Sequence, residues 1–266
     1  MKKIYISADI EGICGVTDWG ETELGSATHE EFRRQMTCEV AAACEGAIEA
    51  GVEEILVQDA HDSARNILAA DLPPKVQLIR GWAGHPYCML QSLDSSYDAV
   101  LFIGYHCAGG RVGNPLAHTM TNDKAYWLKL NGEFVSEFYL NSLIACRENV
   151  PVLFLSGDAE VCAEANQLSS SIATLASKEG MGASTINRHP SEICAETRRL
   201  VAEVLKRGAP GSLTMPQTFT LEICYSGHAL AYRNSFYPGA TLVDGNRLLF
   251  ATQDYFEVLR FIHFVL

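Results

Sequence analysis

The stretch that decides the fold is residues 3–12, KIYISADIEG. Lys3–Ala8 is a short run of strand-forming residues, and Asp9 and Glu11 follow it directly. In an extended chain these two carboxylates lie on the same face, roughly 6.6 Å apart along the strand. That spacing suits two ligands of one metal ion or a bridge between two ions. Gly12 then gives the chain room to turn away.

The alternation of short apolar runs and longer helical patterns continues over the first 160 residues. Strands are expected at 54–57, 76–79, 99–103 and 151–155. Helices are expected over about 28–50, 85–93, 137–147, 158–168 and 190–206. The strands are almost continuously apolar, as strands buried on both faces of a parallel sheet are. The pattern therefore predicts an α/β fold, a Rossmann-like three-layer arrangement around a mostly parallel sheet.

Local signals mark the ends of two of these helices. Thr28 with Glu31 three residues later has the pattern of a capping box, and Gly51 predicts the end of the same helix. Asp158 is expected to cap the helix that follows it rather than to contact a substrate.

The last fifty residues have a different character. Strands are expected at 219–223, 241–243 and 247–251, and a helix over 253–264. Earlier in the chain, Asn131-Gly132 predicts a hairpin within 126–135. We therefore expect an α/β metal-binding catalytic domain over 1–211 and a small α+β lobe over 212–266, with Gly208–Gly211 as the boundary.

Charge and hydropathy exclude several classes of function. The chain has 20 Lys and Arg against 32 Asp and Glu, a formal net charge of −12. This balance argues against nucleic-acid binding, because phosphate backbones recruit cationic side chains. No apolar run reaches the roughly 18 residues that a membrane span needs. The apolar stretch near the N-terminus is short and is broken by Asp9 and Glu11, so we expect a cytoplasmic protein without an export signal.

Nine cysteines occur without any CxxC pair. This usage is typical of reduced, mostly buried thiols in a cytoplasmic protein. Cys38, Cys44 and Cys162 fall on expected apolar helix faces, where a core-filling role is the ordinary one. Cys107 is the only cysteine beside other candidate site residues.

Acidic and histidine side chains follow successive expected strands. Ligands of open α/β sheets bind beyond the carboxyl ends of the strands. The second strand is followed by His61 and the AVLFI strand by His106; a loop then carries His118, and the hairpin leads to Glu137. Each residue alone has an ordinary structural explanation, such as a helix cap or a loop hydrogen bond. Their recurrence after separate strands, together with the acidic pair at 9 and 11, predicts a metal site.

The types of candidate ligand narrow the choice of metal ion. Two histidines with three carboxylates and no cysteine suit Zn²⁺, with Mn²⁺ or Co²⁺ possible. Five ligands are too many for one catalytic zinc, which usually takes three protein ligands. Two ions that share a bridging carboxylate would account for all five ligands. Such pairs of ions lie roughly 3.5–4 Å apart and catalyse hydrolysis in other enzymes.

At this point the sequence resembles a known family. Five motifs occur in order: SADIEG (7–12), QDAH (58–61), GYH (104–106), AHTM (117–120) and NGEFVSEFYLN (131–141). They resemble the D-aminopeptidase DppA family, the M55 metallopeptidases, which are di-zinc aminopeptidases. The resemblance also implies a cytoplasmic, ring-like homodecamer around a central channel.

The resemblance implies a role for each motif residue. Asp9 would bridge two zinc ions. Glu11 and His61 would complete the first metal site, and His106 and Glu137 the second. His118, in the HTM motif, would match the catalytic histidine of the family and act as a general base or nucleophile.

The leading hypothesis is metal-assisted hydrolysis of a short peptide or amino-acid amide from its N-terminus, with D-amino-acid specificity left open. A second enzyme hypothesis is a two-metal phosphoesterase, for which only Arg111 offers a phosphate clamp. Two non-enzymatic hypotheses are a peptide-binding protein without catalysis and a metal-stabilised structural protein. The Gly-rich segment 109–114 is not a phosphate-binding P-loop, and we expect it to be a flexible loop above the site.

Overall fold

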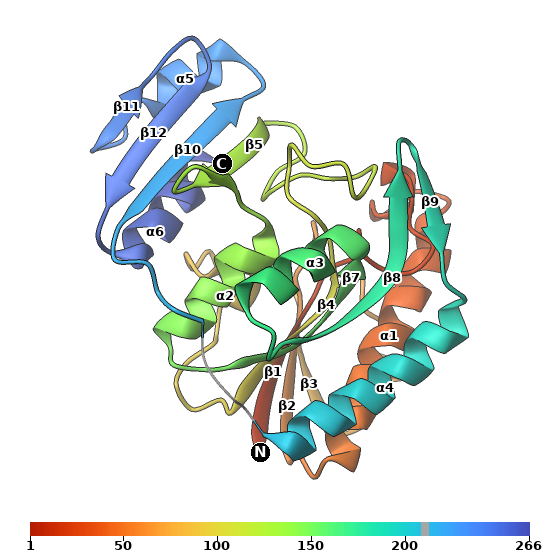
Figure 1. The fold of residues 1–266 in the computed structure, drawn as a ribbon. Helices are drawn as coiled ribbons and strands as arrows, with labels where there is room; N and C mark the ends of the chain where they lie inside the picture. The colour runs from red at the N-terminus through yellow and green to blue at the C-terminus, as the bar shows by residue number, and fades with distance from the viewer. Residues whose placement is uncertain (209–212) are drawn as a thin grey trace.

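The computed structural model describes residues 1–208 and 213–266. Its first sheet has seven strands in the order β3-β2-β1-β4-β7-β8-β9 (Figure 1). The strands are β1 (Lys3–Ala8), β2 (Glu54–Asp59), β3 (Val76–Ile79), β4 (Ala99–Tyr105), β7 (Val152–Asp158), β8 (Ala173–Met181) and β9 (Ser184–Asn187). All neighbours are parallel except β8 and β9. The predicted mostly parallel α/β sheet is therefore confirmed.

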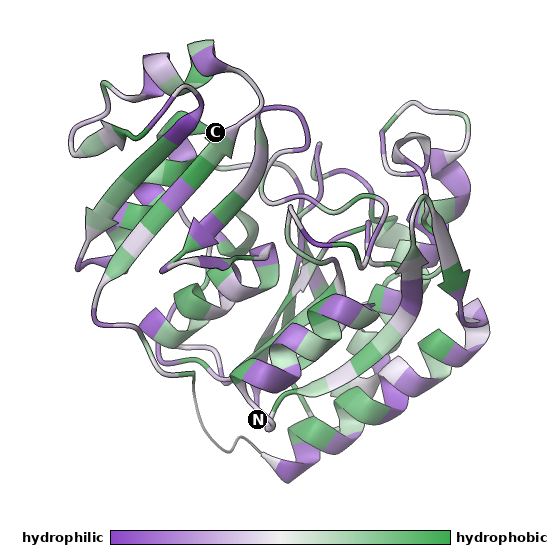
Figure 2. Ribbon diagram, turned by 45° about the horizontal axis from the view of Figure 1, so that its top comes forward, coloured by the Kyte–Doolittle hydropathy of each residue, from purple (hydrophilic) through white to green (hydrophobic). Residues whose placement is uncertain are grey.

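Helices cover both faces of this sheet and make three layers. On one face lie α1 (His29–Glu49) and α4 (Pro190–Arg207), and on the other α2 (Glu137–Arg147) and α3 (Ala159–Leu168). Alternation within β1 explains the division, since Ile4 and Ile6 pack with α1 and α4 while Tyr5 packs with the opposite core. Figure 2 shows hydrophobic and hydrophilic residues mixed on the helices, as expected for elements with one buried face.

A second, antiparallel sheet has the strand order β11-β12-β10-β5-β6. Its strands are β5 (Ala125–Leu130), β6 (Glu133–Phe134), β10 (Phe219–Tyr225), β11 (Ala240–Leu242) and β12 (Arg247–Thr252), with α5 (His228–Asn234) and α6 (Tyr255–Val265) alongside. The predicted hairpin is confirmed, with Asn131 and Gly132 both at positive φ. Strand β5 of this hairpin also pairs with β10. The sheet of the C-terminal lobe therefore contains two strands, β5 and β6, that the sequence analysis placed in the domain 1–211. The predicted boundary itself lies outside the described residues.

Two local expectations are wrong for identifiable reasons. Instead of a helix over 85–93 there is only a short 3-10 turn, Cys88–Leu90, because Cys88 takes a positive φ that an α-helix does not contain. The Thr28 hydroxyl does not cap α1 but donates to the Gly20 carbonyl. Gly51, at φ +87°, does follow the end of α1 as expected.

The cysteines follow the expectation with one exception. All nine thiols are free, and Cys44 and Cys162 are buried, but Cys38 is exposed on α1. Within the described residues, no helix combines the length and apolar character that crossing a membrane requires.

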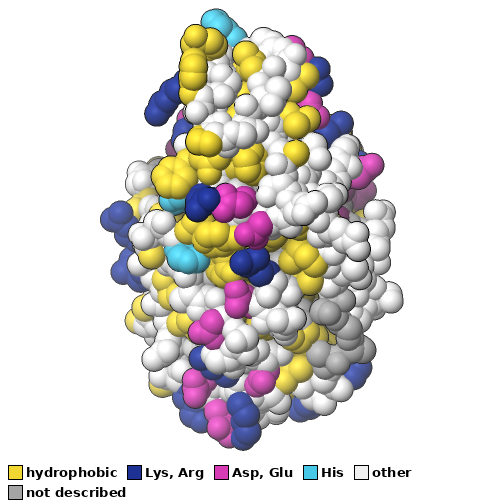
Figure 3. All heavy atoms as spheres, turned by 90° about the vertical axis from the view of Figure 1, so that its left-hand side faces the viewer, with side chains coloured by type: hydrophobic (Ala, Val, Ile, Leu, Met, Phe, Trp, Pro, Cys, Tyr) yellow, Lys and Arg dark blue, Asp and Glu magenta, His cyan; other side chains and the backbone are white. Residues whose placement is uncertain are grey.

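Large hydrophobic side chains are exposed on the C-terminal lobe. They are Tyr232, Phe236, Leu242, Val243 and Phe264. Figure 3 shows hydrophobic side chains at the surface of this end of the molecule. Several large exposed hydrophobic side chains at one end of a molecule are typical of protein–protein contact.

Candidate metal centre

The candidate site lies where three adjacent parallel strands end. Asp9 follows β1, His61 follows β2, and His106 follows β4 directly. Because β1 is the central strand, hydrogen-bonded to β2 on one side and β4 on the other, the carboxyl ends of all three meet at one edge. The chain leaves β1 in one direction and later returns on the other side, which makes this edge a topological switch point, the usual ligand site of such sheets.

The segment after β1 turns at once and does not stay extended. Gly12 N–H donates to the Gly104 carbonyl at 2.8 Å, which folds residues 9–12 against the end of β4. A Cβ at position 12 would lie 1.8 Å from the Tyr105 carbonyl oxygen, so only glycine permits this approach. The extended geometry expected for Asp9 and Glu11 is therefore wrong, yet the turn still brings both carboxylates to the same cluster.

The structure brings all six predicted site residues together. His61 Nδ1 lies 3.3 Å from Asp9 Oδ1 and 3.1 Å from Glu11 Oε2. His106 Nε2 lies 3.5 Å from Asp9 Oδ2 and 3.8 Å from Glu137 Oε2. Asp9 thus lies between two groups of side chains, one with Glu11 and the other with Glu137.

His118 completes the cluster from the loop before β5. Its Nε2 lies 3.5 Å from Glu137 Oε1, and its ring stacks on that of His106 with 4.4 Å between centroids. The ring of Trp19 packs edge-on against His118 at 5.3 Å. The imidazole is therefore held from two sides.

Backbone carbonyls fix the orientation of the three imidazoles. The carbonyl oxygens of Thr22, Cys107 and Leu116 lie 2.9–3.0 Å from His61 Nε2, His106 Nδ1 and His118 Nδ1, respectively. A carbonyl can only accept, so each of these ring nitrogens carries the proton. In the neutral rings the other nitrogen then presents its lone pair to the cluster, which is how histidines that bind metals are oriented.

The closely spaced carboxylates of the cluster shift the pKa values of the residues around them. Burial and the neighbouring Glu11 carboxylate raise the pKa of Asp9 well above its ordinary value. Burial alone would lower the pKa of His106, but the surrounding carboxylates, Glu137 first, outweigh it and raise the pKa to about 9. The same competition raises the pKa of His61 well above its ordinary value. A site that attracts protons this strongly also attracts divalent cations, which compete with protons for these atoms.

The donor set fits metal ions. Among the residues that the structure describes, three buried atoms of the cluster find no hydrogen-bond partner: Asp9 Oδ2, Glu11 Oε2 and His106 Nε2. Native proteins rarely leave such atoms unsatisfied, and a bound ion satisfies them. Asp9, Glu11 and His61 form one set with ligand atoms within 4.8 Å of one another, and Asp9, His106 and Glu137 form another. The shared carboxylate suits two adjacent ions.

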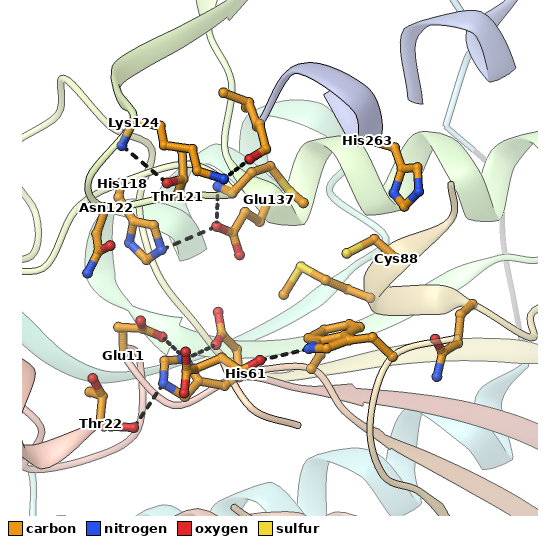
Figure 4. A pocket seen from close by; sticks show the side chains of 18 of the residues that line it. Glu11, Thr22, His61, Cys88, His118, Thr121, Asn122, Lys124, Glu137 and His263 are labelled. Atoms are coloured by element: carbon orange, nitrogen blue, oxygen red, sulfur yellow. Dashed lines mark hydrogen bonds and ion pairs between the residues drawn. The ribbon is translucent and has the colours of Figure 1, made fainter. Parts of the chain in front are cut away.

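The cluster opens into a cavity of about 840 Å³. Asp9, Glu11, His61, His118 and Glu137 line it, and Figure 4 shows the side chains on its opposite walls. Two histidines to which the sequence assigned no role, His85 and His263, also line it. The segment 109–115 does not line this cavity; Gly113 is hydrogen-bonded to Gly180 on β8, so the loop packs beside the site rather than above it.

Two supporting residues were not found from the sequence. Asn114 is buried, and its Nδ2 donates to the Glu11 carbonyl at 3.0 Å and to Asp158 Oδ2 at 3.1 Å. Lys178 is buried in β8, and its ammonium donates to the Glu11 carbonyl. A buried lysine or amide has no local sequence signal, because its burial depends on distant strands. Asp158 caps α3 as predicted, accepting from Val161 N–H.

The fold and the site together define a metal-dependent hydrolase of the α/β class. A model of the peptidase M55 family, described as D-aminopeptidase, matches residues 1–264. The chain belongs to this D-aminopeptidase family. The phosphoesterase hypothesis is not supported. Its only candidate phosphate-binding residue, Arg111, lines a separate small cavity, and Arg111 Nε lies 3.9 Å from Glu160 Oε1.

A similar sequence and a similar solved structure agree with this assignment. A D-aminopeptidase of Bacillus subtilis (strain 168) is 29% identical over 261 residues, which cover 96% of this chain and 93% of the relative. The solved structure of the Zn-dependent D-aminopeptidase DppA from Bacillus subtilis, described as a self-compartmentalizing protease, matches with a TM-score of 0.90 and 27% identity. That match covers 99% of this chain and 96% of the other.

Proposed function

We propose that this chain is a two-zinc aminopeptidase that removes the N-terminal residue of short peptides, with preference for a D-residue there. The observation that carries the proposal is the pair of ligand sets sharing Asp9 on the wall of a cavity large enough for a peptide. Membership of the D-aminopeptidase family and the similarity to a zinc-dependent relative support the metal and the reaction.

Five side chains would hold the ions. Asp9 would bridge them, Glu11 and His61 would complete one site, and His106 and Glu137 the other. Bound zinc supplies a water of lowered pKa and polarises the scissile carbonyl.

His118 would move the proton that peptide cleavage requires. Burial and then the neighbouring His106 lower the pKa of His118, so the ring is neutral near pH 7. Its Nδ1–H donates to the Leu116 carbonyl, which leaves Nε2 free to accept a proton at the cavity wall. The same atom can then give that proton to the leaving amine.

The carboxylates of the cavity would receive the substrate's free ammonium group. Glu23 and Asp62 line the cavity together with the proposed ligand carboxylates. This wall favours the charge that distinguishes a substrate N-terminus from an internal peptide bond.

We further propose a cytoplasmic homo-oligomer, a decamer by resemblance to the family. The exposed apolar side chains of the C-terminal lobe support contact between copies of the chain. Light scattering of the purified protein tests the subunit number, and a monomer at micromolar concentration would contradict it.

The central experiment measures metal content and turnover together. Elemental analysis of zinc-loaded protein should give two ions per chain, and D-alanyl peptides should be cleaved faster than their L-counterparts. His118→Ala should keep its metal and lose roughly 10²–10⁴-fold in kcat. His228→Ala, at an exposed histidine on α5, is the matched control and should match wild type. Two bound ions without turnover of any peptide or amide would defeat the proposal.

A further inference from the structure

The charge of the large cavity is unevenly distributed. Carboxylates dominate its lining, including the three proposed metal ligands and Glu23 and Asp62. Among the described residues that line the cavity, Lys124 is the only lysine or arginine. A single fixed cation in an acidic cavity is the place where an anionic group of a ligand would bind.

The backbone of Lys124 is held by the turn that also supports the metal cluster. Met120 N–H donates to Glu137 Oε1 at 2.6 Å at the start of this turn. Lys124 N–H donates to Thr121 Oγ1 at 3.3 Å, and the Lys124 carbonyl accepts from Ser226 N–H at 2.9 Å. The base of the lysine side chain is thus anchored four residues from Met120, whose N–H contacts Glu137. Figure 4 shows Lys124, Thr121 and Glu137 on the same side of the cavity.

The ammonium group keeps capacity for a ligand. The Lys124 side chain is exposed, and its Nζ donates to the carbonyl oxygen of Leu266, a residue that also lines the cavity. An ammonium has three donors, so two remain beyond this contact. The contact with the Leu266 oxygen also shows that Nζ is within reach of an acceptor.

We propose that Lys124 binds the C-terminal carboxylate of the substrate, so that the enzyme selects short peptides with a free carboxyl end. This inference rests on the proposed aminopeptidase function and names the substrate class of the same cavity. A short peptide at neutral pH has one ammonium and one carboxylate. The cavity offers carboxylates for the first and Lys124 for the second, which fixes the direction in which the peptide lies.

The proposal also limits peptide length. Each further residue moves the carboxylate by roughly 3.3–3.6 Å in an extended chain. The N-terminal end is fixed at the metal cluster, so only a narrow range of lengths places the carboxylate at Nζ. Longer peptides lose this contact and are cleaved less efficiently.

The test compares peptide acids with the matching C-terminal amides. For D-alanyl dipeptides and tripeptides, the wild-type enzyme should show kcat/KM about tenfold higher for the better acid than for its amide, with most of the difference in KM; tenfold corresponds to about 1.4 kcal/mol. Lys124→Met should lower kcat/KM for the acid to the level of the amide and leave the amide unchanged. Lys124→Arg should retain the preference, and Lys75→Met, at an exposed lysine remote from the cavity lining, is the control.

The outcomes separate the two proposals. Equal loss for acid and amide in Lys124→Met would overturn this inference, because it would mean that the lysine acts only by holding Leu266. Equal turnover of acid and amide by the wild-type enzyme would also overturn it while leaving the aminopeptidase function intact. No turnover of either substrate by zinc-loaded wild type would overturn the proposed function and this inference with it.

Discussion

Replacing Asn114 by alanine should lower the stability of the protein and allow the His118 side chain to move from its position. The Asn114 side chain makes three hydrogen bonds: Nδ2 donates to the Glu11 carbonyl and to Asp158 Oδ2, and Oδ1 accepts from Leu116 N–H at 2.9 Å. Two of these are between neutral groups, at about 1 kcal/mol each, and one involves a carboxylate, at about 2 kcal/mol. We expect the free energy of unfolding to fall by about 4 kcal/mol.

The effect on activity follows from the loop geometry. The Leu116 carbonyl accepts from His118 Nδ1 and so orients the imidazole, and Leu116 N–H in turn donates to Asn114. Without the Asn114 side chain, Leu116 is no longer held in place and the imidazole loses its fixed orientation. A displacement of about 1 Å at a reacting group costs roughly 10²-fold in rate. We expect kcat to fall by this factor.

Urea denaturation followed by circular dichroism, at fixed protein concentration, measures the first effect, and steady-state peptide hydrolysis the second. Asn166→Ala is the matched control, because Asn166 is exposed and bonds to Thr174, and it should lose less than about 1 kcal/mol. If Asn114→Ala lost as little as this control and kept its kcat, the loop would be held by other contacts and the reasoning would be refuted.

Three further predictions address the metals, the pH dependence and the turn after β1. Glu137→Gln should reduce bound zinc from two ions to one per chain in elemental analysis; unchanged content would remove Glu137 from the ligand set. Burial raises the pKa of Glu39 from 4.5 to about 7, so the folded state binds this proton more tightly than the unfolded state. The contribution of this proton to the free energy of unfolding is full below pH 4.5 and is lost as the pH rises through 7, a change of about 3 kcal/mol. The urea midpoints at pH 5 and pH 8 should therefore differ less in Glu39→Gln than in wild type. An equal difference in the two proteins would contradict the assignment. Gly12→Ala places a methyl group against the Tyr105 carbonyl and should cost about 3 kcal/mol in urea denaturation, whereas Gly227→Ala meets open space and should cost much less.

The sequence was sufficient for the parallel sheet and for the convergence of the six site residues. Near-continuous apolar strands and chemistry-bearing residues directly after them are local signals, and the parallel arrangement then brings His61 and His106 to one edge. The bending of the chain at Asp9 was not predictable, because it depends on the contact between Gly12 and the end of β4. The assignment of these side chains as metal ligands stays a prediction.

Features that depend on distant contacts escaped the sequence analysis. β8 and β9 are partly exposed strands, and β8 contains Lys178, Glu179 and Gly180, so they lack the apolar run that marked the other strands. The pairing of β5 with β10 joins residues about ninety positions apart and has no local signal. Asn114 looked like an ordinary loop residue, and only the folded chain reveals its contacts with the Glu11 carbonyl and Asp158.

The hairpin of β5 and β6 lies in the chain between His118 and Glu137, and its partner strand, β10, is made much later. During synthesis, therefore, the nascent chain carries every one of the six site residues while the strand that secures the hairpin is still inside the ribosome. The segment between two of the proposed metal-centre residues is therefore paired with a strand from the last fifth of the sequence, so a change that disturbed β10 would reach the centre through this hairpin.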